Sequence, residues 1–350
     1  MRPVAAGLTR RWPPRSRLFL VGEGARWSID HDLLELGRLA TRLGVRVAGT
    51  HLLTVSRGQA AFFGSQFTLL REPWRAFPHA LGTAYFHGRP GTPGMPEFDI
   101  AYEALRTRHA ELARVQVTHA EMHELVLSSG IDPAKVFRIP IGVDLGLFAP
   151  QTPVLRSAAR RALGLPQQAF VVGSFQKDGV GWGNGDEPKA IKGPDVLLEA
   201  VRLFHERVPE LHVLLSGPAR GFVRSGLETL GIPYVHRRQE RYEELAQLYL
   251  ALDAYVVPSR QEGGPKGVLE AMASGVPVVS TRVGQATELI RDGVNGRLVE
   301  VEDAEALAAA LGDPCLSEYA DAGRETALAN GYDAQIPLWR TFFDGFVVHA

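Results

Sequence analysis

The sequence predicts an α/β protein made of two doubly wound domains, each with a parallel sheet between layers of helices. Short apolar runs rich in β-branched residues alternate along the chain with longer segments that carry an apolar stripe at helical spacing. The length of 350 residues is sufficient for two hydrophobic cores. A polar stretch bracketed by Pro150 and Pro153 then marks the boundary between them.

Residues 1–148 are expected to form the first domain. In the helix expected at 30–43, Leu33, Leu36, Ala40 and Leu43 lie on one face. Thr118 and Glu121 resemble a capping box that begins another helix. Residues 50–96 are harder to interpret, because aromatic residues are mixed with glycines and prolines. The predicted strands are 18–21, 83–86, 115–118 and 136–139, and the other predicted helix is 98–113.

Residues 149–334 are expected to form the second domain, where the alternation is clearer. Its predicted strands are 170–174, 211–216, 234–235, 254–257 and 276–280. Its predicted helices are 154–163, one beginning at Pro194, 222–230, 242–252, one carrying Glu270, 287–290, 304–311 and 317–330. Residues 335–347, rich in aromatic side chains, are expected to form a terminal helix.

The composition excludes several classes of protein. A formal net charge of −1 argues against a dedicated nucleic-acid binder, because such domains are usually basic. Cys315 is the only cysteine, which predicts no disulfide and suits a reducing cytoplasm. No apolar run reaches the roughly 20 residues that span a bilayer, and no signal peptide is evident. We expect a cytoplasmic protein, whose basic segment 10–17 allows at most peripheral contact with a membrane.

The stretch 253–303 carries the strongest functional signal. Its first strand ends at Pro258, and the chain then passes through Glu262 and the glycine-rich residues 263–267 into the helix of Glu270. A second strand, loop and helix follow, so two loops point the same way at the carboxyl ends of strands. Glycines allow close backbone approach, and the N–H groups at a helix start favour an anion. A phosphate-bearing ligand is therefore expected.

These motifs together resemble the nucleotide-sugar site of retaining GT-B glycosyltransferases of family four, the glycosyl transferases group 1. The matching elements, in order, are Pro-Ser at 258–259, Glu262, Glu270, AMASGVPVV at 271–279, Val-Gly at 283–284, Glu288 and DGVNG at 292–296. The resemblance implies two Rossmann-like domains facing across a cleft, with residues 335–350 packing back on the first. It also implies transfer of a hexosyl-type sugar from a UDP- or GDP-sugar to a carbohydrate, lipid-linked or small-molecule acceptor, with no cofactor.

The resemblance also implies roles for individual residues. Glu262 would hold donor-sugar hydroxyls, Glu270 the ribose hydroxyls, and Lys192 the charge of the leaving diphosphate. Glu262 as a covalent nucleophile stays open as the lesser alternative. Ser174 stands where the family has an arginine, so Lys177 is the favoured replacement, with Lys189 as the alternative. His87 is placed beside the donor in the cleft. Further donor-binding candidates are Gly22, Gly24, Val235 and the backbone of Gly264, Pro265, Lys266 and Gly267.

Plainer interpretations stay open for some of these residues. Gly22 and Gly24 also fit a tight turn, His87 a structural histidine, and Lys192 a solvated surface lysine. Residues 264–267 depart from the commoner Phe-Gly pattern of the family. The loop 176–189, with four glycines, is expected to be mobile until a diphosphate orders it.

No metal site is predicted. The Asp30-His31-Asp32 run is accounted for by capping at a helix start, and His119 with His123 lacks a third ligand.

Two rival functions are a nucleotide-sugar epimerase of GT-B fold and a non-catalytic subunit that binds sugar nucleotides. Incubation of the donor alone separates an epimerase from a transferase, because only the transferase needs an acceptor.

Overall fold

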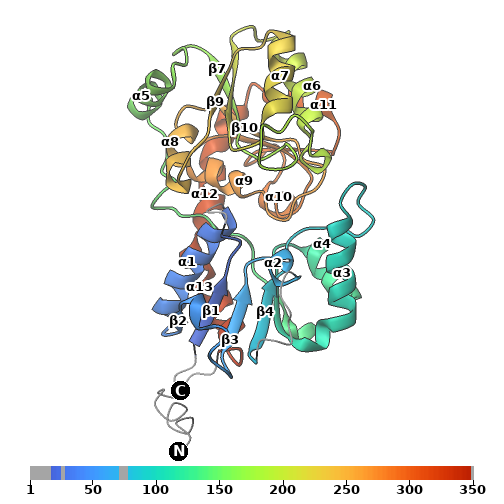
Figure 1. Cartoon of the computed structure of the whole chain (residues 1–350). Helices are drawn as coiled ribbons and strands as arrows, with labels where there is room; N and C mark the ends of the chain where they lie inside the picture. The colour runs from blue at the N-terminus through green and yellow to red at the C-terminus, as the bar shows by residue number, and fades with distance from the viewer. Residues whose placement is uncertain (1–16, 25–27, 71–77, 348–350) are drawn as a thin grey trace, which may run out of the picture.

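The computed structural model describes residues 17–24, 28–70 and 78–347. Two α/β units lie one above the other, each with a six-stranded sheet flanked by helices (Figure 1). Every paired strand in both sheets is parallel. The predicted fold class of two doubly wound domains is therefore confirmed.

The first sheet has the strand order β2-β1-β3-β4-β5-β6. Its strands are β1 (Arg17–Val21), β2 (Arg46–Ala48), β3 (Ala60–Phe63), β4 (Ala80–Ala84), β5 (Leu112–Val117) and β6 (Val136–Arg138). Its helices are α1 (Ser28–Arg42), α2 (Gln66–Leu70), α3 (Pro96–Arg108) and α4 (Ala120–Ser128). The order reverses between β1 and β3, and such a reversal opens a crevice at the carboxyl ends of the strands.

The second sheet has the order β12-β11-β10-β7-β8-β9, as in dinucleotide-binding folds. Its strands are β7 (Phe170–Ser174), β8 (Leu211–Ser216), β9 (Tyr234–Arg237), β10 (Ala254–Val257), β11 (Val278–Thr281) and β12 (Arg297–Val299). Its helices are α5 (Pro153–Leu163), α6 (Pro194–His205), α7 (Gly221–Leu230), α8 (Leu245–Tyr249), α9 (Lys266–Ala273), α10 (Ala286–Leu289), α11 (Ala304–Leu311) and α12 (Tyr319–Ala329). The reversal here lies between β7 and β10.

The last helix, α13 (Ile336–Phe343), returns to the first domain (Figure 1). Trp339 and Phe342 are buried in one cluster with Leu18 and Phe62 of the first sheet. A side chain at Gly82 of β4 would place its Cβ only 2.9 Å from the ring of Phe346. The segment from α13 to Val347 is thus part of the core of the first domain.

Several predicted boundaries differ from the structure. Strands β2, β3 and β12 and helix α2 were not predicted. The helix predicted at 98–113 ends at Arg108, and residues 242–244 form a 3₁₀ turn ahead of α8. The terminal helix ends at Phe343 because Gly345 takes a left-handed φ of 70°. Among the described residues, none of the helices is both long and apolar enough to cross a bilayer.

The predicted capping box at Thr118 is wrong. Helix α4 begins at Ala120, and the hydroxyl of Thr118 instead donates to the carbonyl oxygen of Gly263 in the other domain, at 3.1 Å. The N–H of Ala120 donates to a carboxylate oxygen of Glu288 on α10, at 2.8 Å. A carboxylate at a helix N-terminus accepts a hydrogen bond from a free N–H and interacts favourably with the helix dipole. Glu288 of the second domain therefore caps α4.

Candidate active site in the cleft

Two cavities lie next to each other in the cleft, at the carboxyl ends of the strands. One of about 250 Å³ is lined almost entirely by the second domain, and we call it the lysine cavity, after Lys177, Lys189 and Lys192. The other, of about 230 Å³, extends into the first domain, and we call it the apolar cavity, after Leu33, Leu36 and their neighbours. Five residues line both: Ser28, Lys192, Glu262, Gly264 and Lys266.

An ion pair between Lys192 and Glu262 marks the junction of the two cavities. The Lys192 ammonium lies 2.6 Å from a Glu262 carboxylate oxygen, which also accepts a hydrogen bond of 2.8 Å from the Ser259 hydroxyl. Lys192 ends a short turn before α6, while Ser259 and Glu262 follow β10. A Cβ at Gly193 would lie 2.1 Å from the carbonyl oxygen of Pro258, so glycine after Lys192 is what allows this approach.

Three lysines converge on the lysine cavity. Burial lowers the pKa of Lys177, and the charge of Lys192 lowers it further. Burial likewise lowers the pKa of Lys189, followed by the charges of Lys192 and Lys177. Like charges held together in a partly buried cavity favour a bound anion. Both candidates for the missing family arginine line this cavity, so the prediction that favours Lys177 stays a prediction.

The loop 176–189 packs closely against the turn that precedes α7. The Gly221 N–H donates to the Asn184 carbonyl oxygen at 2.7 Å, and the Phe222 N–H donates to that of Gly185 at 2.9 Å. A Cβ at Gly179 or Gly185 would lie within 2.4 Å of backbone atoms of residue 219. These two glycines therefore allow close packing, and the mobility of the loop stays a prediction.

A buried arginine that the sequence analysis missed supports the start of this loop. The guanidinium of Arg220 donates to the carbonyl oxygens of Ser174 (2.6 Å) and Ser216 (2.9 Å). Its Nε lies 2.9 Å from a carboxylate oxygen of Asp178, and both side chains are fully buried. Burial lowers the pKa of Arg220 and raises that of Asp178. Only the folded structure brings residues 174, 178 and 220 together.

Glu270 is buried on α9 and faces the lysine cavity. The hydroxyls of Tyr242 and Tyr249 donate to its two carboxylate oxygens, that of Tyr249 at 2.7 Å. Burial raises the pKa of Glu270. Each carboxylate oxygen can accept more than one hydrogen bond, so the site retains acceptor capacity for a ligand hydroxyl.

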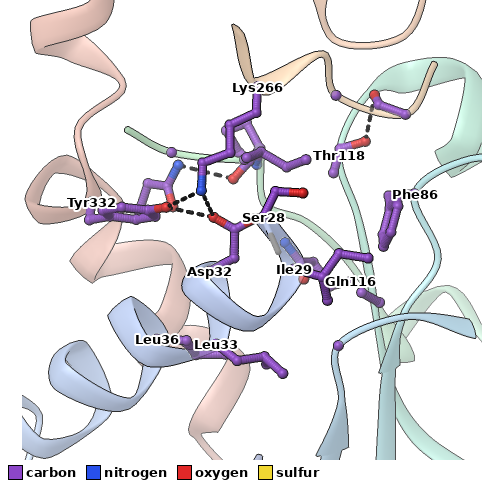
Figure 2. A pocket seen from close by; sticks show the side chains of 18 of the residues that line it. Ser28, Ile29, Asp32, Leu33, Leu36, Phe86, Gln116, Thr118, Lys266 and Tyr332 are labelled. Carbon is purple, nitrogen blue, oxygen red and sulfur yellow. Dashed lines mark hydrogen bonds and ion pairs between the residues drawn. The ribbon is translucent and has the colours of Figure 1, made fainter. Parts of the chain in front are cut away.

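The four residues around the start of α9 also line the lysine cavity: Gly264, Pro265, Lys266 and Gly267. That their backbone binds the donor stays a prediction. A Cβ at Gly267 would lie 2.2 Å from the hydroxyl oxygen of Tyr255, which explains the glycine. The side chain of Lys266 has a further role. Its ammonium pairs with Asp32 of α1, lies 3.1 Å from the Tyr332 hydroxyl, and so connects the domains (Figure 2).

His87 lines the apolar cavity near the junction. Burial, followed by the charges of Lys192 and Lys189, lowers its pKa to about 3. Its ring contacts those of Phe67, Phe86 and Phe98. At neutral pH this histidine is uncharged, and it can act in the site only as a neutral hydrogen-bonding group.

Four predicted donor-binding residues line neither cavity: Gly22, Gly24, Ser174 and Val235. The Gly24 N–H donates to a carboxylate oxygen of Asp30, at 3.2 Å, so this loop forms a turn tied to the start of α1. Ser174 is fully buried under Arg220. Val235 packs partly buried against the core of the second domain.

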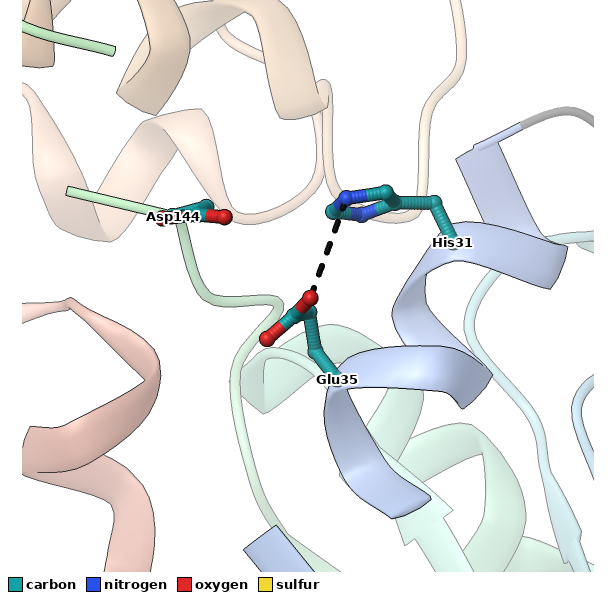
Figure 3. A group of neighbouring side chains, drawn as sticks. All are labelled: His31, Glu35 and Asp144. Carbon is teal, nitrogen blue, oxygen red and sulfur yellow. Dashed lines mark ion pairs between the residues drawn. The ribbon is translucent and has the colours of Figure 1, made fainter. Parts of the chain in front are cut away.

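His31, Glu35 and Asp144 bring their ligand atoms within 4.8 Å of one another (Figure 3). The Lys266 ammonium lies only 3.4 Å from His31 Nδ1, and a cation there opposes metal binding. Burial, with a smaller contribution from the charge of Lys266, lowers the pKa of His31 to about 4. One Asp144 oxygen already accepts the N–H of Gly146 at 2.9 Å. We assign no metal to this cluster.

Residues 182–313 match the family model of glycosyl transferases group 1. The D-inositol 3-phosphate glycosyltransferase of Actinosynnema mirum is 38% identical over 198 residues, which cover 52% of this chain and 44% of that protein. The enzyme of the same name from Corynebacterium urealyticum is 34% identical over 209 residues, which cover 56% and 46%. The chain thus spans about half the length of the curated relatives it matches.

Solved structures with the same fold cover nearly the whole chain. Anabaena Alr3699/HepE in complex with UDP and glucose superposes with a TM-score of 0.72 at 18% identity, over 92% of this chain and 97% of that one. WaaG, a glycosyltransferase of lipopolysaccharide biosynthesis, gives 0.71 at 15% identity, over 94% and 100%. These similarities establish the fold. The chain therefore has the GT-B fold, and its second domain matches the glycosyl transferases group 1.

Proposed function

We propose that the protein transfers a hexosyl-type sugar from a nucleoside-diphosphate sugar to an acceptor hydroxyl, with retention of configuration and without a metal ion. The observation that supports this most strongly is the Lys192–Glu262 pair at the meeting point of two cavities. One cavity is built for an anion and the other opens toward a second substrate. A group-transfer reaction needs such a junction.

The donor fits the lysine cavity. Its diphosphate lies among the three lysines, its ribose hydroxyls bind Glu270, and its sugar reaches Glu262 at the junction. The N-terminus of α9 adds backbone N–H groups and the positive end of a helix dipole. UDP is our first choice of nucleotide, because Anabaena Alr3699/HepE was solved with UDP-glucose.

The reaction follows from these placements. The acceptor oxygen attacks the anomeric carbon on the face from which the diphosphate leaves, and the proton of the acceptor passes to a diphosphate oxygen. The bond between the anomeric carbon and the leaving oxygen of the diphosphate breaks. Lys192 stabilises the negative charge that develops on the diphosphate. Glu262, held by Lys192 and Ser259, orients the hydroxyls of the sugar. No protein side chain forms a bond to the sugar.

The apolar cavity favours a transferase over the two rival functions. An epimerase acts on the donor alone, and a binding subunit has no use for a second cavity that meets the first at a paired lysine and glutamate. The family-model match lies in residues 182–313 of the second domain. The class of acceptor therefore depends on the residues of the first domain that line the apolar cavity.

Incubation of UDP-glucose and GDP-mannose with a panel of acceptors, monitored by proton NMR, tests this function. We expect a glycoside signal that appears only when an acceptor is added and that keeps the anomeric configuration of the donor. A new sugar nucleotide formed from donor alone would identify an epimerase. An inverted product would contradict the same-face mechanism.

A further inference from the structure

The apolar cavity differs in chemistry along its length. Lys192, Glu262, Lys266 and Asp32 surround the end nearest the second domain. The deeper walls come from α1, β3, β4 and α13, and Figure 2 shows Leu33 and Leu36 away from Lys266. These walls are apolar and at most 8% exposed: Leu33, Leu36, Leu39, Phe62, Ala84 and Trp339.

Each charged side chain that lines this cavity already has an oppositely charged partner. Lys192 pairs with Glu262, and Lys266 pairs with Asp32. In the proposed reaction Lys192 also holds the donor diphosphate, so among the described lining residues neither ammonium is left for a phosphate on the second ligand. Drawing either ammonium away would leave a partly buried carboxylate without its partner, which is strongly unfavourable. A phosphate group on the ligand would impose that cost or remain unpaired itself.

Three of the polar side chains that line the cavity, Gln116, Gln335 and Thr118, donate to backbone carbonyl oxygens. The Gln116 amide donates to the carbonyl oxygen of Ile139 at 3.0 Å, and the Gln335 amide donates to that of Pro140 at 2.9 Å. The Thr118 hydroxyl donates to Gly263. These groups hold the backbone of the cleft. The cavity therefore offers little to a polyol that needs a hydrogen bond for each hydroxyl.

We propose that the apolar cavity receives an uncharged alcohol. Its alkyl or aromatic body fills the space between α1, β3 and α13, and its hydroxyl reaches the Lys192–Glu262 pair. This inference rests on the proposed function, because it names the acceptor class of that reaction. It separates this protein from the relatives named for D-inositol 3-phosphate, whose ligand combines a phosphate with a polyol.

The test is a calorimetric titration, in the presence of UDP, with unbranched primary alcohols of increasing length and with D-inositol 3-phosphate. Each added methylene should tighten binding about fourfold until the cavity is full. D-inositol 3-phosphate should bind more weakly than the longer alcohols. Equal affinity along the series, or tighter binding of D-inositol 3-phosphate, would overturn the inference.

Leu36→Asp places a charge in the deep wall and should weaken alcohol binding at least tenfold. Leu34→Asp is the matched control on the same helix, because Leu34 is 63% exposed, and it should leave alcohol binding unchanged. Binding of UDP checks that both variants fold. If Leu36→Asp does not fold, the alcohol series on the unaltered protein decides.

The two proposals fail in different ways. Sugar transfer to D-inositol 3-phosphate, with no binding of alcohols, would overturn this inference and leave the transferase intact. Alcohols that bind with rising affinity, but receive sugar from no donor, would support the inference about the cavity and contradict the transferase.

Discussion

The two cavities of the cleft show how differently two substrate sites can be encoded in one chain. The lysine cavity is built from loops that follow β7, β9 and β10 and from the start of α9, and most of its predicted residues stand in short motifs of the sequence. The apolar cavity is built from single residues on α1, β3, β4 and α13. Motifs and family matches therefore describe the first cavity, whereas only the folded structure describes the second.

The largest effect is expected from removing Asp178, the buried carboxylate that pairs with Arg220 at the start of the loop 176–189. Asp178→Ala leaves the guanidinium of Arg220 buried without its carboxylate, which should lower the free energy of unfolding by about 3–5 kcal/mol. Chemical denaturation measures this loss. Glu187→Ala, at an exposed position of the same loop, is the control and should stay within about 0.5 kcal/mol of the parent. A loss below about 1 kcal/mol for Asp178→Ala would show that the pair does not support the loop.

Lys192→Ala tests whether the junction acts in the transition state. Turnover should fall about a hundredfold or more, while the KM for the donor changes less, because Lys192 acts on charge that develops as the diphosphate leaves. Steady-state kinetics with varied donor measures both quantities. Lys192→Arg should recover only part of the rate, since a planar guanidinium replaces a compact ammonium. Full activity of Lys192→Ala would remove this residue from the mechanism.

Glu270→Ala and Glu262→Ala should separate nucleotide binding from turnover. Loss of the charged acceptor at Glu270 should weaken UDP binding by about 1.5–3 kcal/mol, or roughly 10- to 150-fold. Glu262→Ala should leave UDP affinity nearly intact while turnover collapses, because UDP carries no sugar. Calorimetry with UDP measures both affinities. Equal affinities for the two variants would contradict the assignment of nucleotide binding to Glu270 alone.

The lowered pKa values of Lys177 and Lys189 predict a smaller effect, on pH dependence. An ammonium binds the diphosphate only while protonated, so UDP affinity should decline as pH rises toward the lysine pKa. Because burial places these pKa values below the ordinary 10.5, the decline should begin at lower pH than for an exposed lysine. We expect a loss of a few-fold between about pH 8 and pH 10 by titration calorimetry.

Uridine, which has the same titrating base but no phosphate, is the control, and UDP affinity should fall more steeply than uridine affinity across this range. The lysines themselves are distinguished by kinetics at neutral pH. Lys177→Ala should reduce turnover more than Lys189→Ala, and the opposite order would make Lys189 the replacement for the family arginine.

The smallest effect is expected for hydrogen exchange in the loop 176–189. Within the loop, the N–H groups of Val180 and Lys189 donate to the carbonyl oxygens of Glu187 and Asp178, which predicts slow exchange of Val180 and Lys189 whether or not UDP is bound. Protection that appears only with UDP would restore the mobility predicted from the glycines alone.

Much of the fold could be predicted because local patterns agree with it. The stripe of Leu33, Leu36 and Ala40 gives α1, and the Lys192-Gly193-Pro194 run gives the start of α6. Strand β3 was missed because its four buried residues, Ala-Ala-Phe-Phe, show no alternation and have neighbours rich in glycine and aromatic residues. Central strands that are buried on both faces lack the signal on which the prediction depends.

Contacts between distant residues account for most of what the sequence could not predict. Lys266 and Asp32 are 234 positions apart, and nothing near either residue indicates the other. The helix cap that Glu288 gives to α4 likewise needs both domains in place. The apolar walls around Leu36 and Trp339 resemble ordinary core positions in the sequence, and the structure alone shows that they border a cavity.

The most direct test of the account is a crystal structure of the protein with UDP. We predict that the phosphate oxygens lie within about 3.2 Å of the Lys192 ammonium and of at least one of Lys177 and Lys189, with the ribose hydroxyls on Glu270. The apolar cavity should hold no phosphate. A nucleotide seated among Leu33, Leu36 and Trp339, or phosphates that contact none of the three lysines, would contradict the division of the cleft into donor and acceptor cavities.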